Sequence, residues 1–392
     1  MVIVINGTIT SNIDGITVTD DGNGNLTISG DITVTDDGNG NVAIAQEVTD
    51  FSVTINRADG EIDWSKGFSA SYYMTIVDPA SWRDLERVEI TGGTISRTGS
   101  GLRQSADVEC TDFDPEREQW VRVYLDVAQA GDVAHVALFT GLSSVPERAI
   151  DGNRTRYPLT CYSVLKPAED VLLQRGWFAP SGANGAELVA DLLSVTPAPV
   201  TVEANAPSLA QSIIAENGEN RLTMTNKILA AINWRLRIEG DGSITICPQA
   251  SELSGTFGLD NDVIEPKLTR RADWFSCPNV FRAISGSMTA VVRDDSEDSM
   301  LSTVSRGREI WMEEKCDLNS GESLEQYAQR RLQEEQAVAY SVQYARRYDP
   351  KILVGDLVRL HYPAQNLMNT YVVTRQSIDL SYGARTSEEV QM

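Results

Sequence analysis

The sequence predicts a β-rich α+β protein in which two antiparallel β domains flank a mixed α/β middle region, preceded by a repeated β-hairpin arm. Two observations predict this class. Alternating apolar and polar residues between turn signals fill much of the chain, and helical periodicity occurs mainly near its middle. The 392 residues also suffice for two or three domains. We place an arm at 1–47, a first β domain at 48–166, a middle domain at 167–265 and a second β domain with one helix at 266–392.

The arm is identified by an internal repeat. Residues 16–25, ITVTDDGNGN, recur as residues 32–41, so the period is sixteen. Each copy alternates like a strand, turns through Asp, Gly and Asn, and continues into a second short strand, which is typical of a hairpin. The first fifty residues hold eight acidic groups and no Lys or Arg, too polar for a core of their own. The arm is expected to add strands to another copy or another protein, or to pack on its own domain, through Ile16, Val18, Ile32 and Val34.

The turns of the two repeats contain the only residues that suggest a metal. Oxygen-bearing side chains alternate there as at the start of a calcium loop: Asp21, Asn23, Asn25, Asp37, Asn39 and Asn41. The pattern then fails, because Leu26 and Val42 stand where such a loop needs Gly. Asn and Gly also make tight turns without metal. We therefore favour plain hairpin turns and expect no cofactor.

The region from 48 to 166 consists of short β-patterned segments separated by turn signals such as Gly92-Gly93 and Asp114-Pro115. Several strands at such intervals predict an all-β barrel or sandwich. The segments are 51–56, 70–77, 87–91, 106–111, 120–129, 133–144 and 157–165.

The middle region mixes helical and strand patterns. Residues 185–193 are predicted to form a helix, and the Pro-rich stretch 196–199 follows as a linker. A second predicted helix at 225–232 leads into a β-hairpin, with strands at 234–238 and 243–246 around a Gly-rich turn.

The last seventy residues begin with a helix. Ser323 and Gln326 have the spacing of a capping box, in which each side chain bonds the backbone N–H of the other residue. Alternating residues at 340–348 then predict a strand, and strands at 352–362 and 371–380 follow. Gly355-Asp356 interrupts the second of these and suits a corner that lets a barrel close. The other strands of this barrel are expected to begin near Asn279.

Composition excludes several classes of function. The 33 basic and 56 acidic residues give a net charge of −23, which argues against gripping nucleic acid or an anionic membrane. No run of about eighteen apolar residues occurs, so no membrane span is expected, and the N-terminus lacks a secretory signal pattern. The five cysteines are widely spaced without a C-x-x-C pair, which predicts reduced, mostly buried thiols, as in a protein folded in cytoplasm.

The sequence offers no convincing catalytic constellation. Its two histidines, His135 and His361, stand in β-patterned segments without a nearby His or Cys partner. The acidic run at 294–298 is best interpreted as a solvated loop. We expect no catalytic residues and no enzyme activity.

Three stretches resemble the trimeric baseplate-hub or tail-hub proteins of long-tailed bacteriophages. The first is the helix-to-hairpin stretch, ILAAINW at 228–234 followed by EGDGSI at 239–244, and the second is CPNVFR at 277–282. The third is the C-terminal module, with VGDLV at 354–358 and TYVV at 370–373. Together they cover roughly the C-terminal half, whereas the repeated arm departs from the usual start of such proteins.

The resemblance implies a homotrimeric ring at the virion tail tip, assembled in the host cytoplasm. Each copy would carry two tube-like β-barrels, so six barrels meet a sixfold tail tube on one side and a threefold spike on the other. The partners would be a distal tail or tail tube protein, a central spike or fibre and the tape measure protein. The ring would close the tail until DNA ejection, with DNA only in passage through the lumen. Acidic residues facing the lumen would disfavour sticking to phosphates.

Two alternatives belong to other classes: a glycan- or receptor-binding β protein of the tail tip, and a cell-wall hydrolase acting through carboxylates. Within the hub hypothesis, we expect subunit contacts along two C-terminal strands, because open strand edges invite sheet continuation. The residues predicted for these contacts are Tyr340, Val342, Tyr344, Val358, Leu360 and Tyr362.

Overall fold

The computed structural model describes two compact units, 1–63 with 127–135 and 64–126 with 136–392, and each is considered by itself. In the first sixty-one residues it describes only five short strands. The other described residues are 62–110, 113, 117–144, 149–151, 154–258, 264–265, 267–272, 274–316, 322–338, 340–365, 367–381 and 383–392.

Each copy of the N-terminal repeat contains one antiparallel strand pair. In the first copy β2 (Thr17–Asp20) pairs with β3 (Leu26–Ser29), and β1 (Val4–Ile5) adds to β3. In the second copy β4 (Thr33–Asp36) pairs with β5 (Val42–Ala45). The predicted strand at 51–56, the six candidate metal ligands and the side chains of Ile16, Val18, Ile32 and Val34 lie outside the described residues.

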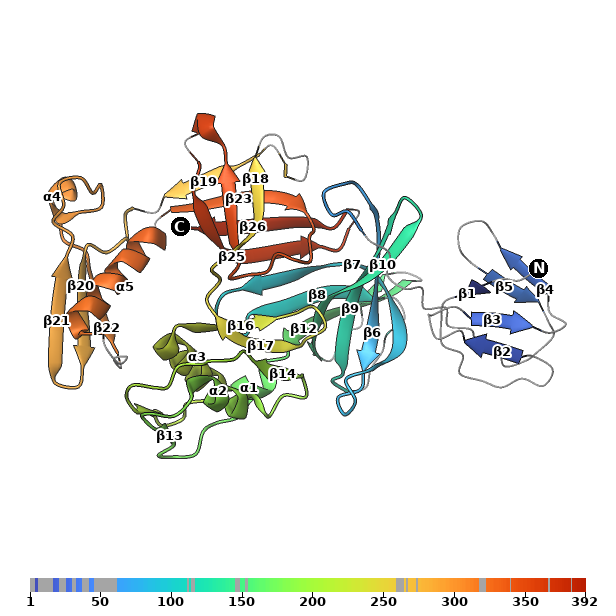
Figure 1. Ribbon diagram of the computed structural model, residues 1–392, viewed down its shortest axis with the longest axis horizontal. Helices are drawn as coiled ribbons and strands as arrows, with labels where there is room; N and C mark the ends of the chain where they lie inside the picture. The colour runs from blue at the N-terminus through green and yellow to red at the C-terminus, as the bar shows by residue number, and fades with distance from the viewer. Residues whose placement is uncertain are drawn as a thin grey trace. The chain divides into compact units, whose positions relative to one another are not determined.

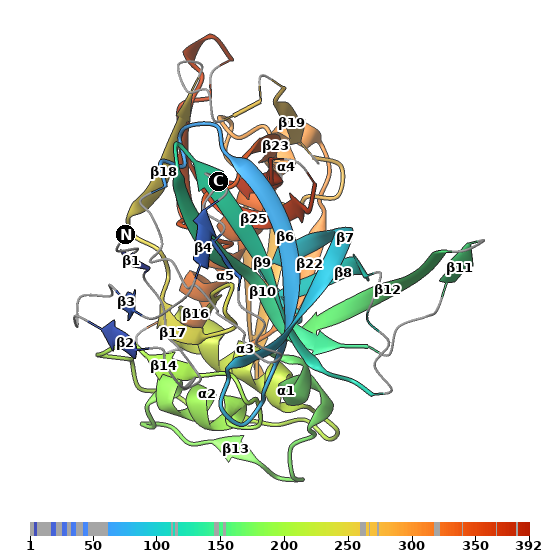
Figure 2. The ribbon, with the colours of Figure 1, turned by 90° about the vertical axis from the view of Figure 1, so that its right-hand side faces the viewer.

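In the main sheet, six strands pair in a closed, ring-like order, β6–β7–β8–β12–β10–β9 and back to β6 (Figures 1 and 2). Their bounds are β6 (Ser69–Val77), β7 (Asp84–Thr98), β8 (Gln104–Cys110), β9 (Trp120–Gln129), β10 (Asp132–Ser143) and β12 (Arg154–Ser163). A short strand, β11 (Ala149–Asp151), pairs with the start of β12. Six of the seven strands predicted for this region are therefore present.

Gly92-Gly93 was predicted to separate two strands. This prediction is wrong, because the pair lies inside the fifteen-residue β7. The register with β8 shifts between Ile90 and Gly92, so this is a β-bulge. Gly93 has φ +148°, and a Cβ there would collide with the carbonyl oxygen of Asp107 on β8. Only glycine allows the two strands to approach this closely.

The C-terminal strands continue the same sheet. The second half of β25 (Thr370–Asp379) pairs with β7, from Arg375 opposite Thr98 to Asp379 opposite Thr94. Beyond β25 the order is β26 (Arg385–Gln391), β23 (Tyr340–Arg347) and β19 (Thr269–Ala272). The first half of β25 pairs with β24 (Leu357–His361), which lies parallel to β18 (Leu253–Gly258). The two predicted β regions therefore share one thirteen-stranded sheet, a connection that the sequence did not predict.

The middle region packs three helices against a small sheet. Helix α2 (Gly185–Leu193) has the predicted bounds, and α3 (Arg221–Ile232) begins four residues before the predicted start because Asn220 caps it, accepting from the Thr223 N–H at 2.8 Å. The predicted hairpin is β16 (Trp234–Ile238) with β17 (Ile244–Pro248), joined by the parallel β14 (Val200–Val202). The remaining elements are α1 (Lys166–Asp170), β13 (Phe178–Ala179) and β15 (Ile213–Ile214).

Residues 274–338 form a separate lobe. Strands β21 (Met288–Arg293), β20 (Val280–Ser285) and β22 (Trp311–Lys315) make a three-stranded sheet, on which α5 (Leu324–Val338) packs (Figure 1). The predicted capping box of α5 is confirmed, since Ser323 N–H donates to Gln326 Oε1 at 2.8 Å and Gln326 N–H to Ser323 Oγ at 3.1 Å.

The expectation that strands near Asn279 complete the C-terminal β domain is wrong, because these strands pair only with one another among the described residues. A short α4 (Thr303–Arg306) and a 3-10 turn (Pro363–Gln365) complete the elements.

The cysteines are reduced and mostly buried, as the sequence predicts. None of the five cysteines forms a disulfide, four are buried and Cys316 is partly buried. Burial raises the pKa of the Cys110 thiol to about 12. No helix among the described residues is long and apolar enough to cross a membrane.

A row of buried polar side chains runs beneath the main sheet. Arg346 forms a bidentate ion pair with Glu388, with Nε–Oε2 at 2.9 Å and Nη2–Oε1 at 2.6 Å. Both side chains are fully buried. Gln376 Nε2 donates to Glu388 Oε1 at 2.7 Å, and its Oε1 accepts from Arg97 Nη1 at 3.3 Å. Because Arg97 also donates to the Leu138 carbonyl oxygen, this network connects the two halves of the sheet.

We predict that Glu388→Gln lowers stability by about 3–5 kcal/mol, because it leaves the buried Arg346 charge uncompensated. The double variant Arg346→Met/Glu388→Leu should lose much less, since it buries no unpaired charge. The midpoint of urea unfolding measures both, with Glu389→Gln on the exposed face as control. A double variant less stable than the single one would contradict this account of the network.

Candidate functional site

The six residues predicted for subunit contacts contribute to the interior of their own chain. Val342, Tyr344, Val358, Leu360 and Tyr362 lie in one buried cluster, and Tyr340 packs beside a second. Strand β23 is paired on both sides, by β26 and β19, and β24 by β25 and β18. The open edge on which the prediction rested is therefore not found at these strands, and the outermost strands on this side of the sheet are β18 and β19.

Among the described residues, the structure brings together no catalytic or metal-binding group that the sequence had suggested. His361 is exposed on β24, and His135 lies on β10. The described residues contain no group of three or more His, Cys, Asp or Glu side chains placed to hold a metal ion. The site is therefore sought in surfaces and junctions that could support assembly.

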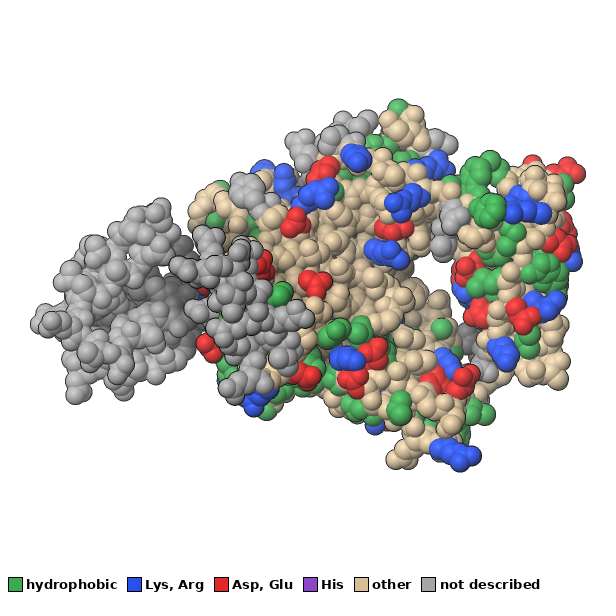
Figure 3. Space-filling view, turned by 180° about the vertical axis from the view of Figure 1, so that it is seen from behind, with side chains coloured by type: hydrophobic (Ala, Val, Ile, Leu, Met, Phe, Trp, Pro, Cys, Tyr) green, Lys and Arg blue, Asp and Glu red, His purple; other side chains and the backbone are tan. Residues whose placement is uncertain are grey.

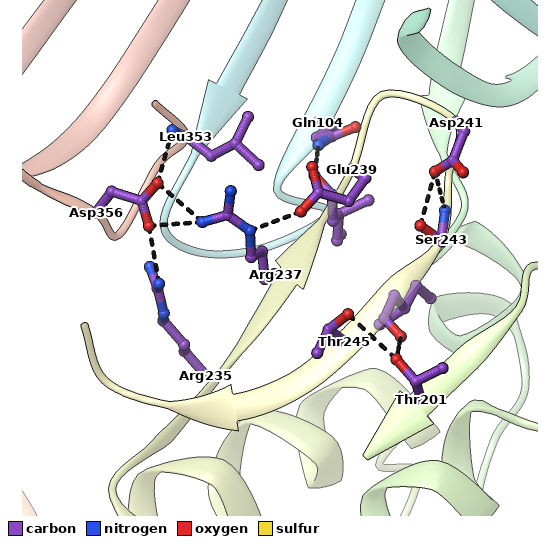
Figure 4. A network of polar contacts seen from close by, with 12 residues as sticks. Gln104, Thr201, Arg235, Arg237, Glu239, Asp241, Ser243, Thr245, Leu353 and Asp356 are labelled. Atoms are coloured by element: carbon purple, nitrogen blue, oxygen red, sulfur yellow. Dashed lines mark hydrogen bonds and ion pairs between the residues drawn. The ribbon is translucent and has the colours of Figure 1, made fainter. Parts of the chain in front are cut away.

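The junction between the middle region and the main sheet is built on Asp356, whose side chain is 2% exposed. It follows the Gly355 bend and accepts hydrogen bonds from Arg235 Nη2 at 2.8 Å and from Arg237 Nη1 at 2.8 and 2.9 Å (Figure 4). The backbone N–H of Leu353 donates to the same carboxylate at 3.0 Å. Both arginines stand on β16, where alternate residues share one face. Figure 4 shows them converging on Asp356 from that strand.

Two further groups complete the junction. Arg237 Nε donates to Glu239 Oε1 at 2.6 Å, and Gln104 of β8 donates to the Ile238 carbonyl oxygen at 3.0 Å. Burial, and then the charge of Arg235, lowers the pKa of the Arg103 guanidinium to about 10. Three arginines, Arg103, Arg235 and Arg237, therefore lie close together at the junction. The buried carboxylate of Asp356 offsets their mutual repulsion by pairing with two of them.

Gly355 is needed here for two reasons. Its φ is +91°, and a Cβ would collide with the Arg235 guanidinium. The Gly355-Asp356 corner was predictable from the sequence, whereas its arginine partners were not predicted. The pattern Arg235-Leu236-Arg237 could have indicated them, because it places two like charges on one face of a strand. Two like charges that are partly buried require a counter-charge.

A second candidate surface is the exposed face of the main sheet at β7, β25, β26, β23 and β19. One row across these strands consists of the register partners Thr98, Arg375, Glu389, Gln343 and Thr269. The next row consists of the small residues Ser96, Ser377, Ser387 and Ala345. Because the residues of the second row are small, they form the floor of a depression beside longer charged side chains.

These rows line a hollow of about 540 Å³, with Lys267, Glu265 and Arg385 on its rim. Arg385 Nη2 donates to Glu265 Oε2 at 2.9 Å, and this bond holds the pKa of the Glu265 carboxyl below its usual range. Gln343 Nε2 donates to Glu389 Oε2 at 3.3 Å. We call this hollow the serine-floored groove. Among the described residues that line it, no Ser or Thr hydroxyl is hydrogen-bonded to a carboxylate or a histidine.

The face of the molecule shown in Figure 3 is not uniformly acidic. Figure 3 shows acidic and basic side chains interspersed over one face, and on the lobe, at the right of that view, hydrophobic side chains lie among them. The last part of the chain, 340–392, holds six basic and five acidic residues, although the net charge of the chain is −23. The acidic excess therefore comes from other parts of the sequence.

We predict that Asp356→Asn lowers the free energy of unfolding, measured by urea titration, by about 3 kcal/mol, because Arg235 and Arg237 lose the buried carboxylate that pairs with both of them. The control is Asp379→Asn, which removes the same charge from an exposed position on β25. Limited proteolysis of Asp356→Asn should also release the middle region faster. Equal midpoints for both variants would show that the junction does not depend on this carboxylate.

Comparison with solved structures places this architecture among known folds. The 43 kDa tail protein of prophage MuSo2 from Shewanella oneidensis is similar over 83% of this chain and 97% of its own, with a TM-score of 0.60 and 13% identity. A tail protein from Neisseria meningitidis matches over 82% and 97%, with a TM-score of 0.61 and 13% identity. A prophage tail protein from Listeria monocytogenes matches over 82% and 94%, with a TM-score of 0.50 and 10% identity.

No protein-family model and no curated protein matched the sequence. The similarity is thus one of three-dimensional structure, and it extends over more than four fifths of the chain. The chain has the fold of these bacteriophage tail proteins.

Proposed function

We propose that this protein is a structural virion protein, the homotrimeric hub of a phage tail or baseplate. It joins the sixfold tail tube or distal tail ring to a threefold spike or central fibre and closes the tail until DNA is ejected. The observation that carries the proposal is the fold shared with phage tail proteins over more than four fifths of the chain.

The construction of the chain supports this role in two ways. The β7–β25 pairing holds two β-rich regions in one sheet, so each copy presents two such regions to a ring. The Asp356 junction fixes the middle region against that sheet. Three rigid copies would supply six β-rich regions around a channel, which suits a sixfold partner.

The partners in this proposal are a distal tail or tail tube protein, a tape measure protein and a central spike or fibre. DNA contacts the ring only in passage through its lumen. The excess of acidic residues, 56 against 33 basic ones, weakens adhesion to phosphates during that passage.

We predict that the purified full-length chain is a trimer. Native mass spectrometry should give three times the mass of one chain, and the assembly should persist on dilution to low micromolar concentration. A monomer under these conditions, at both low and physiological salt, would contradict the hub.

The arm at 1–47 is proposed to dock on the neighbouring tail protein. Deleting these residues should weaken attachment to purified tail tubes at least tenfold, while native mass spectrometry still gives the ring. A matched control keeps the length of the arm and replaces only Ile16, Val18, Ile32 and Val34 by Ser. Unchanged attachment by the deleted chain would remove the arm from this role.

A further inference from the structure

Two basic side chains that line the serine-floored groove form no ion pair with a described residue, although Arg375 lies opposite Glu389 in the strand register. Lys267 and Arg375 are exposed, and neither side chain forms a hydrogen bond or ion pair with another described residue. By contrast, the nearby Arg385 is bound by Glu265. The lining holds four basic and three acidic residues, so in a chain of net charge −23 this concavity has a small positive excess, which suits an acidic partner.

The shape of the groove limits the kind of partner. Its floor crosses β7, β25, β26 and β23, so it is roughly 15 Å long at a strand spacing of about 4.8 Å. The residues that line it include one aromatic side chain, Tyr344, and this ring is buried. Single-stranded nucleic acid binds through stacking on exposed rings. The groove therefore favours an acidic segment of protein.

The loop at 294–298, Asp-Asp-Ser-Glu-Asp, supplies such a segment. Glu297 and Asp298 are exposed, and the carboxylate of neither is bound by another described residue. The loop thus carries four carboxylates: those of Asp294 and Asp295 accept hydrogen bonds from uncharged side chains, and those of Glu297 and Asp298 face solvent. No residue of the lobe 274–338 lines the groove, so these carboxylates do not pair with its cations within one chain.

Hydrogen bonds anchor the start of the loop at Asp294. Asp294 accepts from Ser299 Oγ at 2.7 Å and from Gln336 Nε2 at 3.0 Å, and its backbone carbonyl accepts from the Thr303 N–H at 2.8 Å. A preorganised loop loses little conformational entropy on binding. Beside it, Met300 and Val304 are 60% and 58% exposed, an apolar surface that a contact would remove from water.

We infer that the serine-floored groove of one copy receives the acidic loop 294–298 of the next copy, with Lys267 and Arg375 facing Glu297 and Asp298. The contact joins two different surfaces, so it is heterologous and generates a ring when the rotation closes. The inference rests on the proposed ring and assigns one of its subunit contacts.

The test is a charge swap in the full-length chain. Lys267→Glu/Arg375→Glu should raise the concentration for half-assembly at least tenfold, measured by native mass spectrometry or sedimentation across a dilution series. Glu297→Lys/Asp298→Lys should weaken assembly similarly. Combining all four substitutions in one chain should recover most of the loss, because the attraction is restored with opposite signs.

Lys351→Glu/Arg359→Glu is the matched control, since it makes the same charge change at two exposed positions that do not line the groove. Thermal melting checks that each variant is folded. The contact would be overturned if neither pair of substitutions raised the concentration for half-assembly. It would also be overturned if the combined variant assembled no more tightly than the variants with one pair. Either result would leave the hub proposal unaffected. A native chain that is monomeric would overturn both.

Discussion

The arrangement of this protein depends on one buried carboxylate. Asp356 is held between two arginines of β16 and the backbone of its own turn, at the point where the middle region meets the main sheet. A buried carboxylate is costly unless it is paired, and so are the arginines. Each group therefore requires the other, and the middle region is stably joined to the sheet only in the orientation that brings them together.

A second constraint acts within the sheet. Arg346, Glu388, Gln376 and Arg97 form a polar row across the interior, and the row crosses from the C-terminal strands to β7. Such a network fixes register, because sliding one strand by a residue would move every charge to the wrong face. The network thereby holds the two β-rich regions together, as the proposed ring requires of each copy.

Local features were predictable because they depend on nearby residues. The capping box at Ser323 and Gln326, the helix at 185–193 and most strands of the first β region follow from spacing and turn chemistry. The β7–β25 pairing was not predictable, since it joins segments almost three hundred residues apart through backbone hydrogen bonds that leave no mark in either pattern. Strands β20 to β22 were assigned to the wrong sheet for the same reason.

In the candidate sites, too, local features were predictable from the sequence and long-range contacts were not. The Gly355-Asp356 corner was visible in the sequence, but its arginine partners lie more than a hundred residues away. Tyr344 and Tyr362 were predicted at an interface from strand pattern, whereas burial in their own chain depends on which strands cover them. The serine-floored groove arises only when the register aligns Ser96, Ser377 and Ser387.

The central claim is that three copies close into a ring whose β-rich regions alternate around a channel. An electron cryo-microscopy reconstruction of the assembled protein bound to tail tube tests it most directly. The account predicts threefold symmetry with six β-rich regions facing the tube. An assembly with another number of copies, or one in which the middle regions face the tube instead, would contradict it.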